Sequence, residues 1–112
     1  MKLSEYQQEF TKNIAYLILK AGNIGVGLTF GEVYRTEYQQ AEYLRTGKSK
    51  TMNSNHLRRL AVDFNFFIDG KLYYDHPKIN ELGEYWEKLH PANRWGGNFK
   101  TFKDAPHFEM NA

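Results

Sequence analysis

Residues 54–63 of this chain read SNHLRRLAVD, and residues 104–107 read DAPH. The first segment places His56 shortly before Asp63, which lies inside an apolar run. The second segment places Asp104 just before His107. Two imidazoles and one carboxylate, from His56, Asp63 and His107, are the ligand composition of a catalytic zinc site that keeps its fourth position for water. Asp104 is then a second carboxylate beside such a site.

The residues around Asp63 predict a strand that would carry it. Apolar and other side chains alternate from residue 60 to 68, and the apolar face comprises Leu60, Val62, Phe64, Phe66 and Ile68. The pair Asp69-Gly70 predicts a hairpin turn into residues 71–73. Residues 107–110 have the pattern of a last short strand. If these two strands are neighbours, the two histidines and Asp63 can converge.

The remaining elements follow from caps and helical spacing. Ser4 and Gln7 predict a capping box for a helix over about residues 5–21, and residues 26–35 predict a strand. Thr36 and Gln39 predict a second capping box for a helix that ends near residue 46, followed by a polar loop over 47–55. Pro77 begins a third helix that ends before residue 91, and residues 93–102 are expected to form a loop or edge strand. The fold class is α+β, with three helices against a small, mostly antiparallel sheet.

Composition limits the possible functions. A length of 112 residues predicts one domain, spanning residues 1–112, with one modest core. The net charge of +2 is too small for the basic stripe of a nucleic-acid-binding protein. The chain has no cysteine, so a transition-metal site must be built from His, Asp and Glu.

The N-terminal residues do not predict a targeting segment. Residues 1–5 lack a long apolar core and a cleavage site, and no window reaches the 18 apolar residues of a membrane span. We therefore expect synthesis in the cytoplasm, a monomer, no stable membrane association and no nucleic-acid partner.

Each candidate ligand has a purely structural alternative. Asp63 could form a salt bridge with Arg58 or Arg59, because an aspartate on a strand needs a partner. His56 or His107 alone is more often a surface or hydrogen-bonded core residue than a ligand. A Ser-His-Asp triad from Ser54, His56 and Asp63 is disfavoured, because no G-x-S-x-G turn surrounds the serine. The joint occurrence of the three ligand types favours the metal site.

Taken together, four motifs give this chain a family resemblance. They are Ser54-x-His56, Ala61-Val62-Asp63, Trp95-Gly96-Gly97 and the segment from Asp104 to Glu109. Their order and spacing resemble the zinc peptidases of bacterial cell walls, which include D-alanyl-D-alanine carboxypeptidases and the L-alanyl-D-glutamate endopeptidases of phage endolysins. The segment Tyr34-Arg35-Thr36, with Gln39 or Gln40, also resembles the upstream arginine segment of that family. The resemblance covers roughly residues 30–110 and implies the fold shared with the hedgehog signalling domain.

The resemblance implies a role for each matching residue. His56, Asp63 and His107 would bind Zn²⁺, Asp104 would be the general base, and Arg35 would steady the substrate carbonyl or a carboxylate. Ser54 is a candidate for substrate or loop contacts, and Trp95 for either a cleft wall or an ordinary core position. Glu109 or Asn65 could orient a ligand histidine. Many members have a glycine three residues after the first histidine, where this chain has Arg59.

The function implied is a zinc-dependent peptidoglycan peptidase. The small size, the lack of a signal peptide and the lack of a wall-binding domain favour a phage endolysin that cleaves the L-alanyl-D-glutamate bond of stem peptides and reaches the wall after release. A D-alanyl-D-alanine carboxypeptidase is the alternative enzyme. A non-catalytic zinc-binding recognition module of the same fold is the third possibility, although such a module has no need of Asp104.

Overall fold

The computed structural model describes residues 1–49 and 51–112. Within them lie three α-helices, α1 (Leu3–Asn23), α2 (Glu37–Arg45) and α3 (Pro77–Leu89). Five strands form the sheet: β1 (Gly27–Phe30), β2 (Ala61–Ile68), β3 (Lys71–Tyr73), β4 (Asn93–Trp95) and β5 (His107–Met110). Two short 3-10 helices, η1 (Asn55–Arg58) and η2 (Gly96–Asn98), precede β2 and follow β4. The predicted α+β class is confirmed.

Strand β2 is the centre of the sheet. Its first residues pair with β5, and its later residues pair with β1 and β3. Strand β5 also pairs with β4, so that the order is β1-β2-β5-β4 with β3 beside β2. Every pairing is antiparallel. The hairpin predicted at Asp69-Gly70 is confirmed, with a left-handed backbone at both residues.

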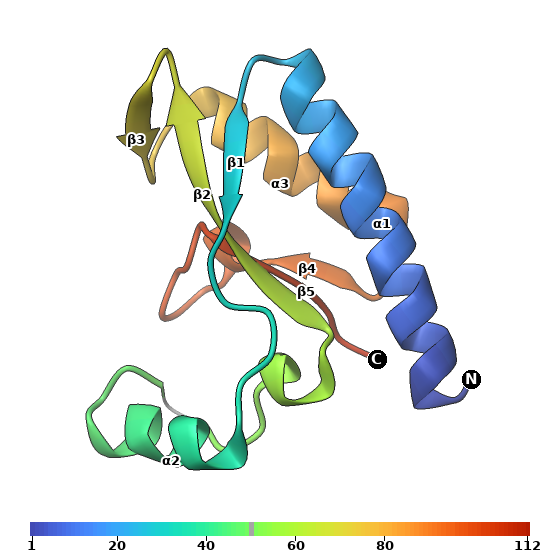
Figure 1. Cartoon of the computed structure of the whole chain (residues 1–112), viewed down its shortest axis with the longest axis vertical. Helices are drawn as coiled ribbons and strands as arrows, with labels where there is room; N and C mark the ends of the chain where they lie inside the picture. Colours follow the sequence, from blue (N-terminus) through green and yellow to red (C-terminus); the bar gives the residue numbers. More distant parts are fainter. Residues whose placement is uncertain (50) are drawn as a thin grey trace.

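The core lies between the sheet and two of the helices. The apolar face predicted for β2 is buried, and it packs with Phe108 of β5 and with Trp86 of α3. Helix α1 adds Phe10 and Leu17 to the same cluster. Helix α2 lies apart from these layers, beside the segment that leads into β2 (Figure 1). Gln40 is the buried residue of α2.

Two boundaries differ from those predicted for the N-terminal helix and the first strand. Helix α1 begins at Leu3, because the Glu5 side chain accepts a hydrogen bond from the Lys2 backbone N–H at 3.1 Å. The predicted Ser4–Gln7 capping box is therefore wrong, and the Gln7 amide instead donates to the Arg58 carbonyl at 2.7 Å. The strand predicted to reach residue 35 ends at Phe30, because residues 31–35 turn toward η1.

The other predicted elements are confirmed with small shifts. The Thr36 hydroxyl caps α2 by accepting a hydrogen bond from the Gln39 N–H at 3.0 Å. Pro77 is at the start of α3, and His76 caps it. The loop predicted over residues 47–55 ends in η1, which the polar composition did not predict, and residue 50 of that loop lies outside the described residues.

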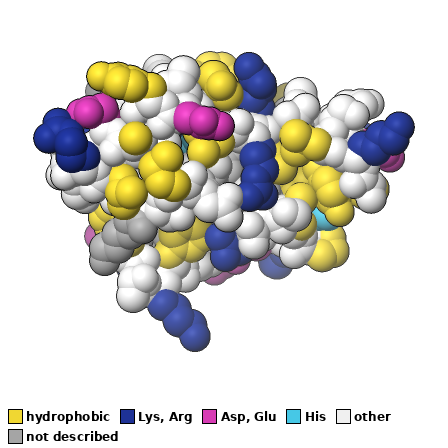
Figure 2. Space-filling model, turned by 90° about the horizontal axis from the view of Figure 1, so that it is seen from below, with side chains coloured by type: hydrophobic (Ala, Val, Ile, Leu, Met, Phe, Trp, Pro, Cys, Tyr) yellow, Lys and Arg dark blue, Asp and Glu magenta, His cyan; other side chains and the backbone are white. Residues whose placement is uncertain are grey.

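Lys and Arg side chains do not gather in one stripe on the face drawn in Figure 2, where they are dispersed among hydrophobic ones. None of the helices that the structure describes has the length and hydropathy needed to cross a membrane.

Candidate metal centre

Three segments of the fold bring His56, Asp63 and His107 together. His56 lies in η1, directly before β2, and the Ser54 hydroxyl caps η1 by accepting a hydrogen bond from the His56 N–H at 3.2 Å. Asp63 lies on β2, and His107 is the first residue of β5. The antiparallel register places Asp63 directly opposite His107. The convergence expected from two neighbouring strands therefore occurs.

The three side chains meet at one carboxylate oxygen. Asp63 Oδ1 lies 3.3 Å from His56 Nε2 and 3.2 Å from His107 Nδ1. One ligand atom from each of these residues lies within 4.8 Å of the other two. The group is therefore compact enough to hold a single metal ion.

The far nitrogen of each ring identifies the atom that faces the site. His56 Nδ1 lies 3.0 Å from the Val33 carbonyl oxygen, and a carbonyl can only accept, so Nδ1 carries the proton. His107 Nε2 lies 2.7 Å from Glu109 Oε1 and donates to that carboxylate. In the neutral rings, the remaining nitrogens turn their lone pairs toward Asp63.

The three ligand atoms are better suited to bind a cation than to bind one another. Two imidazole lone pairs and a carboxylate oxygen are all acceptors, and acceptors that face one another need a cation or a proton between them. His56 Nε2 is buried and makes no hydrogen bond to the described residues. Ligand histidines usually donate their other N–H to a carbonyl or a carboxylate, as His56 and His107 do here.

The close contact of these side chains also shifts the pKa values of Asp63 and His107. Burial alone would raise the pKa of Asp63, but the neighbouring imidazoles of His107 and His56 outweigh burial and hold this pKa well below its usual range. Burial alone would lower the pKa of His107, but the hydrogen bonds to Asp63 and Glu109 raise it to about 9. Without a metal ion, a protonated His107 ring would donate to Asp63 near neutral pH.

Asp104 lies at the same cleft. The cleft has a volume of about 260 Å³, and its lining includes Arg35, Ser54, His56, Asp104 and His107. Burial, followed by the charge of Asp63, raises the pKa of Asp104 above its ordinary value. A carboxylate with a raised pKa is better suited to accept and return a proton near neutral pH.

Gly96 lets the backbone carrying Asp104 approach η2. A Cβ atom at Gly96 would lie 2.1 Å from the Asp104 carbonyl oxygen and 2.9 Å from His107 Cβ. The Asp104 N–H donates to the Gly96 carbonyl at 2.9 Å, and the His107 N–H donates to the Asp104 carbonyl at 3.0 Å. Gly96 of the Trp95-Gly96-Gly97 motif therefore allows the backbone of Asp104 and His107 to lie close to η2.

Trp95 itself does not line this cleft. It is 5% exposed, and its indole N–H donates to the Ala105 carbonyl at 2.7 Å. Of the two positions expected for Trp95, its burial and its absence from this lining favour the core position.

The structure also identifies the partners of Asp63 and of the ligand histidines. Arg58 donates to Asn53, and the Arg59 guanidinium lies over the Tyr34 ring, so the contacts of Asp63 in the structure are with the histidines instead. Of the two residues expected to orient a ligand histidine, Glu109 does so, whereas the amide of Asn65 bonds Thr29 and Tyr74.

Sequence reasoning did not identify the groups that support the site from outside, although it named Gln40 as an alternative to Gln39 in the segment around Arg35. The Val33 carbonyl orients His56, but a backbone acceptor leaves no trace in the residue type. Glu32 pairs with Arg35, and Gln40 binds the same guanidinium. The position of Glu32 three residues before Arg35 was the available signal for that pair.

Comparisons with known proteins agree with this arrangement. Residues 47–110 match a family model described as D-alanyl-D-alanine carboxypeptidase. The chain is 30% identical to the peptidoglycan L-alanyl-D-glutamate endopeptidase CwlK of Bacillus subtilis, over 88% of this chain and 70% of that protein. It is also 30% identical to the L-alanyl-D-glutamate peptidase of Listeria phage A118, over 78% of this chain but only 31% of that protein.

A solved structure resembles the whole fold. The L-Ala D-Glu endopeptidase ChiX of Serratia marcescens matches with a TM-score of 0.71 and 25% identity, over 98% of this chain and 86% of that one. The family match includes all three residues of the candidate metal centre and Asp104. The chain therefore belongs to the D-alanyl-D-alanine carboxypeptidase family of peptidases.

Proposed function

We propose that this chain is a zinc-dependent peptidoglycan peptidase that cleaves the L-alanyl-D-glutamate bond of stem peptides. The observation that carries the proposal is the convergence of His56 Nε2, Asp63 Oδ1 and His107 Nδ1 at a cleft that Asp104 also lines. The choice of bond is supported by the names of the relatives from Bacillus, Listeria phage and Serratia.

Zinc is the metal that we propose. Two imidazole nitrogens and one carboxylate oxygen, with no thiolate, match a catalytic zinc site that leaves one position open. A site for Mg²⁺ or Ca²⁺ would instead be built from oxygen ligands. When bound, zinc would lower the pKa of a water molecule to about 7 and so supply hydroxide near neutral pH.

Asp104 and Arg35 complete the proposed chemistry. The Asp104 carboxylate accepts the proton of the attacking water and then delivers it to the leaving amide nitrogen. Arg35 lines the same cleft and offsets the negative charge that develops on the carbonyl oxygen, an effect worth about 3 kcal/mol for one well-placed donor in other hydrolases. Ser54 acts through the loop, because its hydroxyl caps η1 and also accepts a hydrogen bond from Arg35 at 3.4 Å.

The cellular setting is part of the proposal. We propose a single catalytic domain over residues 1–112 that works as a monomer on the peptides of the bacterial wall, without a nucleic-acid partner. The similarity to the Listeria phage enzyme supports an endolysin made in the host cytoplasm and released to the wall.

A second enzyme activity has its own support. The matching family model is described as D-alanyl-D-alanine carboxypeptidase, and a carboxypeptidase would use Arg35 to hold the free C-terminal carboxylate of its substrate. The two activities differ in the bond cut and not in the metal centre.

Mass spectrometry of soluble products separates these possibilities. Zinc-loaded protein is incubated with purified peptidoglycan beside a chelator-treated control. We expect zinc-dependent release of peptides that begin at D-glutamate. Loss of a terminal D-alanine alone would identify the carboxypeptidase, and stoichiometric zinc without any product would identify a recognition module.

A further inference from the structure

Gln40 is a fully buried polar side chain that the proposed chemistry does not use. It is the buried residue of α2, a helix that otherwise lies apart from the sheet (Figure 1). A buried amide is costly unless its donors and its acceptor are all satisfied. The sequence alone did not distinguish Gln40 from its neighbour Gln39.

Each end of the Gln40 amide has a different partner. Its Oε1 accepts a hydrogen bond from Arg35 Nη1 at 2.7 Å. Its Nε2 donates to Ser49 Oγ at 2.9 Å and to the Thr51 carbonyl. One side chain thus connects the guanidinium that lines the cleft to the segment that leads into η1 and its metal-ligand candidate His56.

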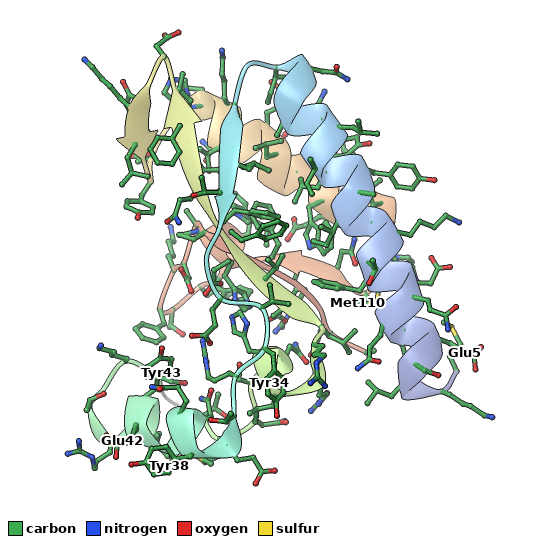
Figure 3. The ribbon with its side chains drawn as sticks, in the orientation of Figure 1. Glu5, Tyr34, Tyr38, Glu42, Tyr43 and Met110 are labelled. Carbon is green, nitrogen blue, oxygen red and sulfur yellow. The ribbon has the colours of Figure 1, made fainter. Side chains whose placement is uncertain are left out.

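The Arg35 guanidinium is held from several directions. Nε donates to Glu32 Oε1, and the plane of the group lies over the Tyr43 ring at 4.6 Å from its centroid. The Tyr43 hydroxyl donates to the other oxygen of Glu32 at 3.0 Å, so the ring and the carboxylate also hold each other. Figure 3 shows Tyr43 on the side of α2 that faces the rest of the domain, whereas Tyr38 and Glu42 point away from it.

Glu32 and Gln40 contact different nitrogens of the Arg35 guanidinium and have different effects on it. Glu32 neutralises the charge of Arg35, and Gln40 binds the terminal nitrogen nearest the metal-ligand loop, as the contact of the same Nη1 with Ser54 at 3.4 Å indicates. An amide suits this position because it offers an acceptor to Arg35 and donors to Ser49 and Thr51 at once. A carboxylate offers only the acceptor.

We propose that Gln40 is a positioning residue that aims the Arg35 guanidinium at the reacting carbonyl. The inference rests on the proposed function, because it assigns Gln40 an effect on turnover through Arg35. A misplacement of about 1 Å can cost about a hundredfold in rate, so the loss of this one contact is expected to lower kcat.

Gln40→Met removes both hydrogen-bonding ends at similar volume, and Gln39→Met is the matched control on the same helix. We expect Gln40→Met to lower kcat about 10- to 100-fold with little change in KM or zinc content, and Gln39→Met to stay within about twofold of wild type. Gln40→Glu keeps the acceptor for Arg35 but loses the donors to Ser49 and Thr51, so its kcat is expected to lie between those of Gln40→Met and wild type. A loss in Gln40→Glu as large as that in Gln40→Met would overturn the proposal.

A double-mutant cycle distinguishes positioning from general structural support. In an Arg35→Ala background, Gln40→Met is expected to change kcat by less than about twofold, because there is no guanidinium left to aim. An equal fold loss in both backgrounds would show that Gln40 acts independently of Arg35.

The Arg35 side chain also provides a readout that does not depend on turnover. In nitrogen-15 NMR spectra, we expect slowly exchanging protons on Arg35 Nη1 in wild type and Gln40→Glu, and faster exchange in Gln40→Met, because Nη1 is the atom that Gln40 binds. Unchanged exchange in Gln40→Met would refute the inference even if the protein were inactive on peptidoglycan. An inactive wild-type protein with the expected exchange pattern would instead count against the proposed function.

Discussion

Replacing Asp104 with asparagine keeps the size of the side chain but removes its ability to accept a proton. We expect Asp104→Asn to bind one zinc ion as wild type does and to lose about 10²- to 10⁴-fold in turnover, the usual contribution of a general base. Metal analysis and peptide release from peptidoglycan measure the two properties separately. His107→Ala is the matched comparison and should lose both. Wild-type turnover in Asp104→Asn would remove Asp104 from the mechanism.

Arg59 occupies the position at which many members of the resembling family have glycine. It ends η1 in the left-handed conformation, with φ 56° and ψ 37°, and its guanidinium lies over the Tyr34 ring at 4.1 Å. The turn therefore keeps the conformation that favours glycine, although the side chain differs. Arg59 makes this turn between His56 in η1 and Asp63 on β2.

Two substitutions at Arg59 separate backbone strain from the ring contact. Arg59→Gly and Arg59→Ala both lose the contact with Tyr34, but only alanine keeps the penalty of the left-handed conformation. We expect Arg59→Gly to be more stable than Arg59→Ala by about 1 kcal/mol in the free energy of urea unfolding. Equal stability would mean that the turn relaxes out of the left-handed region.

At the scale of elements, the contact of α3 with β4 depends on one glycine. A Cβ atom at Gly83 would lie 2.1 Å from the Trp95 ring, whereas a Cβ atom at Gly22 near the end of α1 would have nothing within 4 Å. By helix propensity alone, alanine should be favoured over glycine at both positions by about 1 kcal/mol. Alanine at Gly22 therefore reports helix propensity alone, whereas alanine at Gly83 reports helix propensity together with the clash against Trp95.

We expect the two alanine substitutions to act in opposite directions. Gly22→Ala should raise the free energy of unfolding by up to about 1 kcal/mol. Gly83→Ala should lower it by about 1–3 kcal/mol, because the methyl group forces Trp95 and β4 away from α3. Urea denaturation of both variants provides the measurement. If Gly83→Ala raised the free energy of unfolding instead, α3 and β4 would be able to move apart without loss of stability.

At the scale of the whole molecule, the metal-free site links stability to pH. The pKa of His107 is raised from 6.5 to about 9, so the protonated ring favours the folded state. This contribution is fully present below about pH 6.5 and is lost as the pH rises through about 9, with an upper bound of about 3 kcal/mol. Thermal unfolding of the metal-free protein across this range should show the decline. His107→Gln should flatten it, and an unchanged decline in that variant would assign it to another group.

Bound zinc should stabilise the domain more at high pH, which opposes the loss of stability expected for the metal-free protein. The ligands come from η1, β2 and β5, so a bound ion favours the folded state by about 2.7 kcal/mol at a free concentration of 100 Kd. Protons compete for the same lone pairs, so the stabilisation by zinc should be larger at pH 9 than at pH 6.5. Thermal unfolding with zinc and with a chelator measures the difference. Equal stabilisation at both pH values would contradict the assigned ligands.

Several elements of the fold could be predicted from local sequence patterns. Alternation fixed the buried face of β2, Asp69-Gly70 fixed the turn, and Thr36 and Pro77 fixed the starts of two helices. The types and spacing of the acidic and histidine side chains indicated a metal site. These properties follow from the geometry of a few consecutive residues, so neighbouring residue types are sufficient to specify them.

Which of the candidate groups meet depends on long-range contacts in the folded chain. The pairing of β2 with β5 placed His107 opposite Asp63, and the turn of residues 31–35 brought the Val33 carbonyl to His56. The same folding assigned Gln7 to the Arg58 carbonyl and not to a helix cap. Long-range pairings and contacts with backbone carbonyls depend on how layers pack, and packing involves residues that are distant in sequence. For that reason the ligand types could be predicted from the chain, whereas the orienting group of His56 could not, and that of His107 could be narrowed only to Glu109 or Asn65.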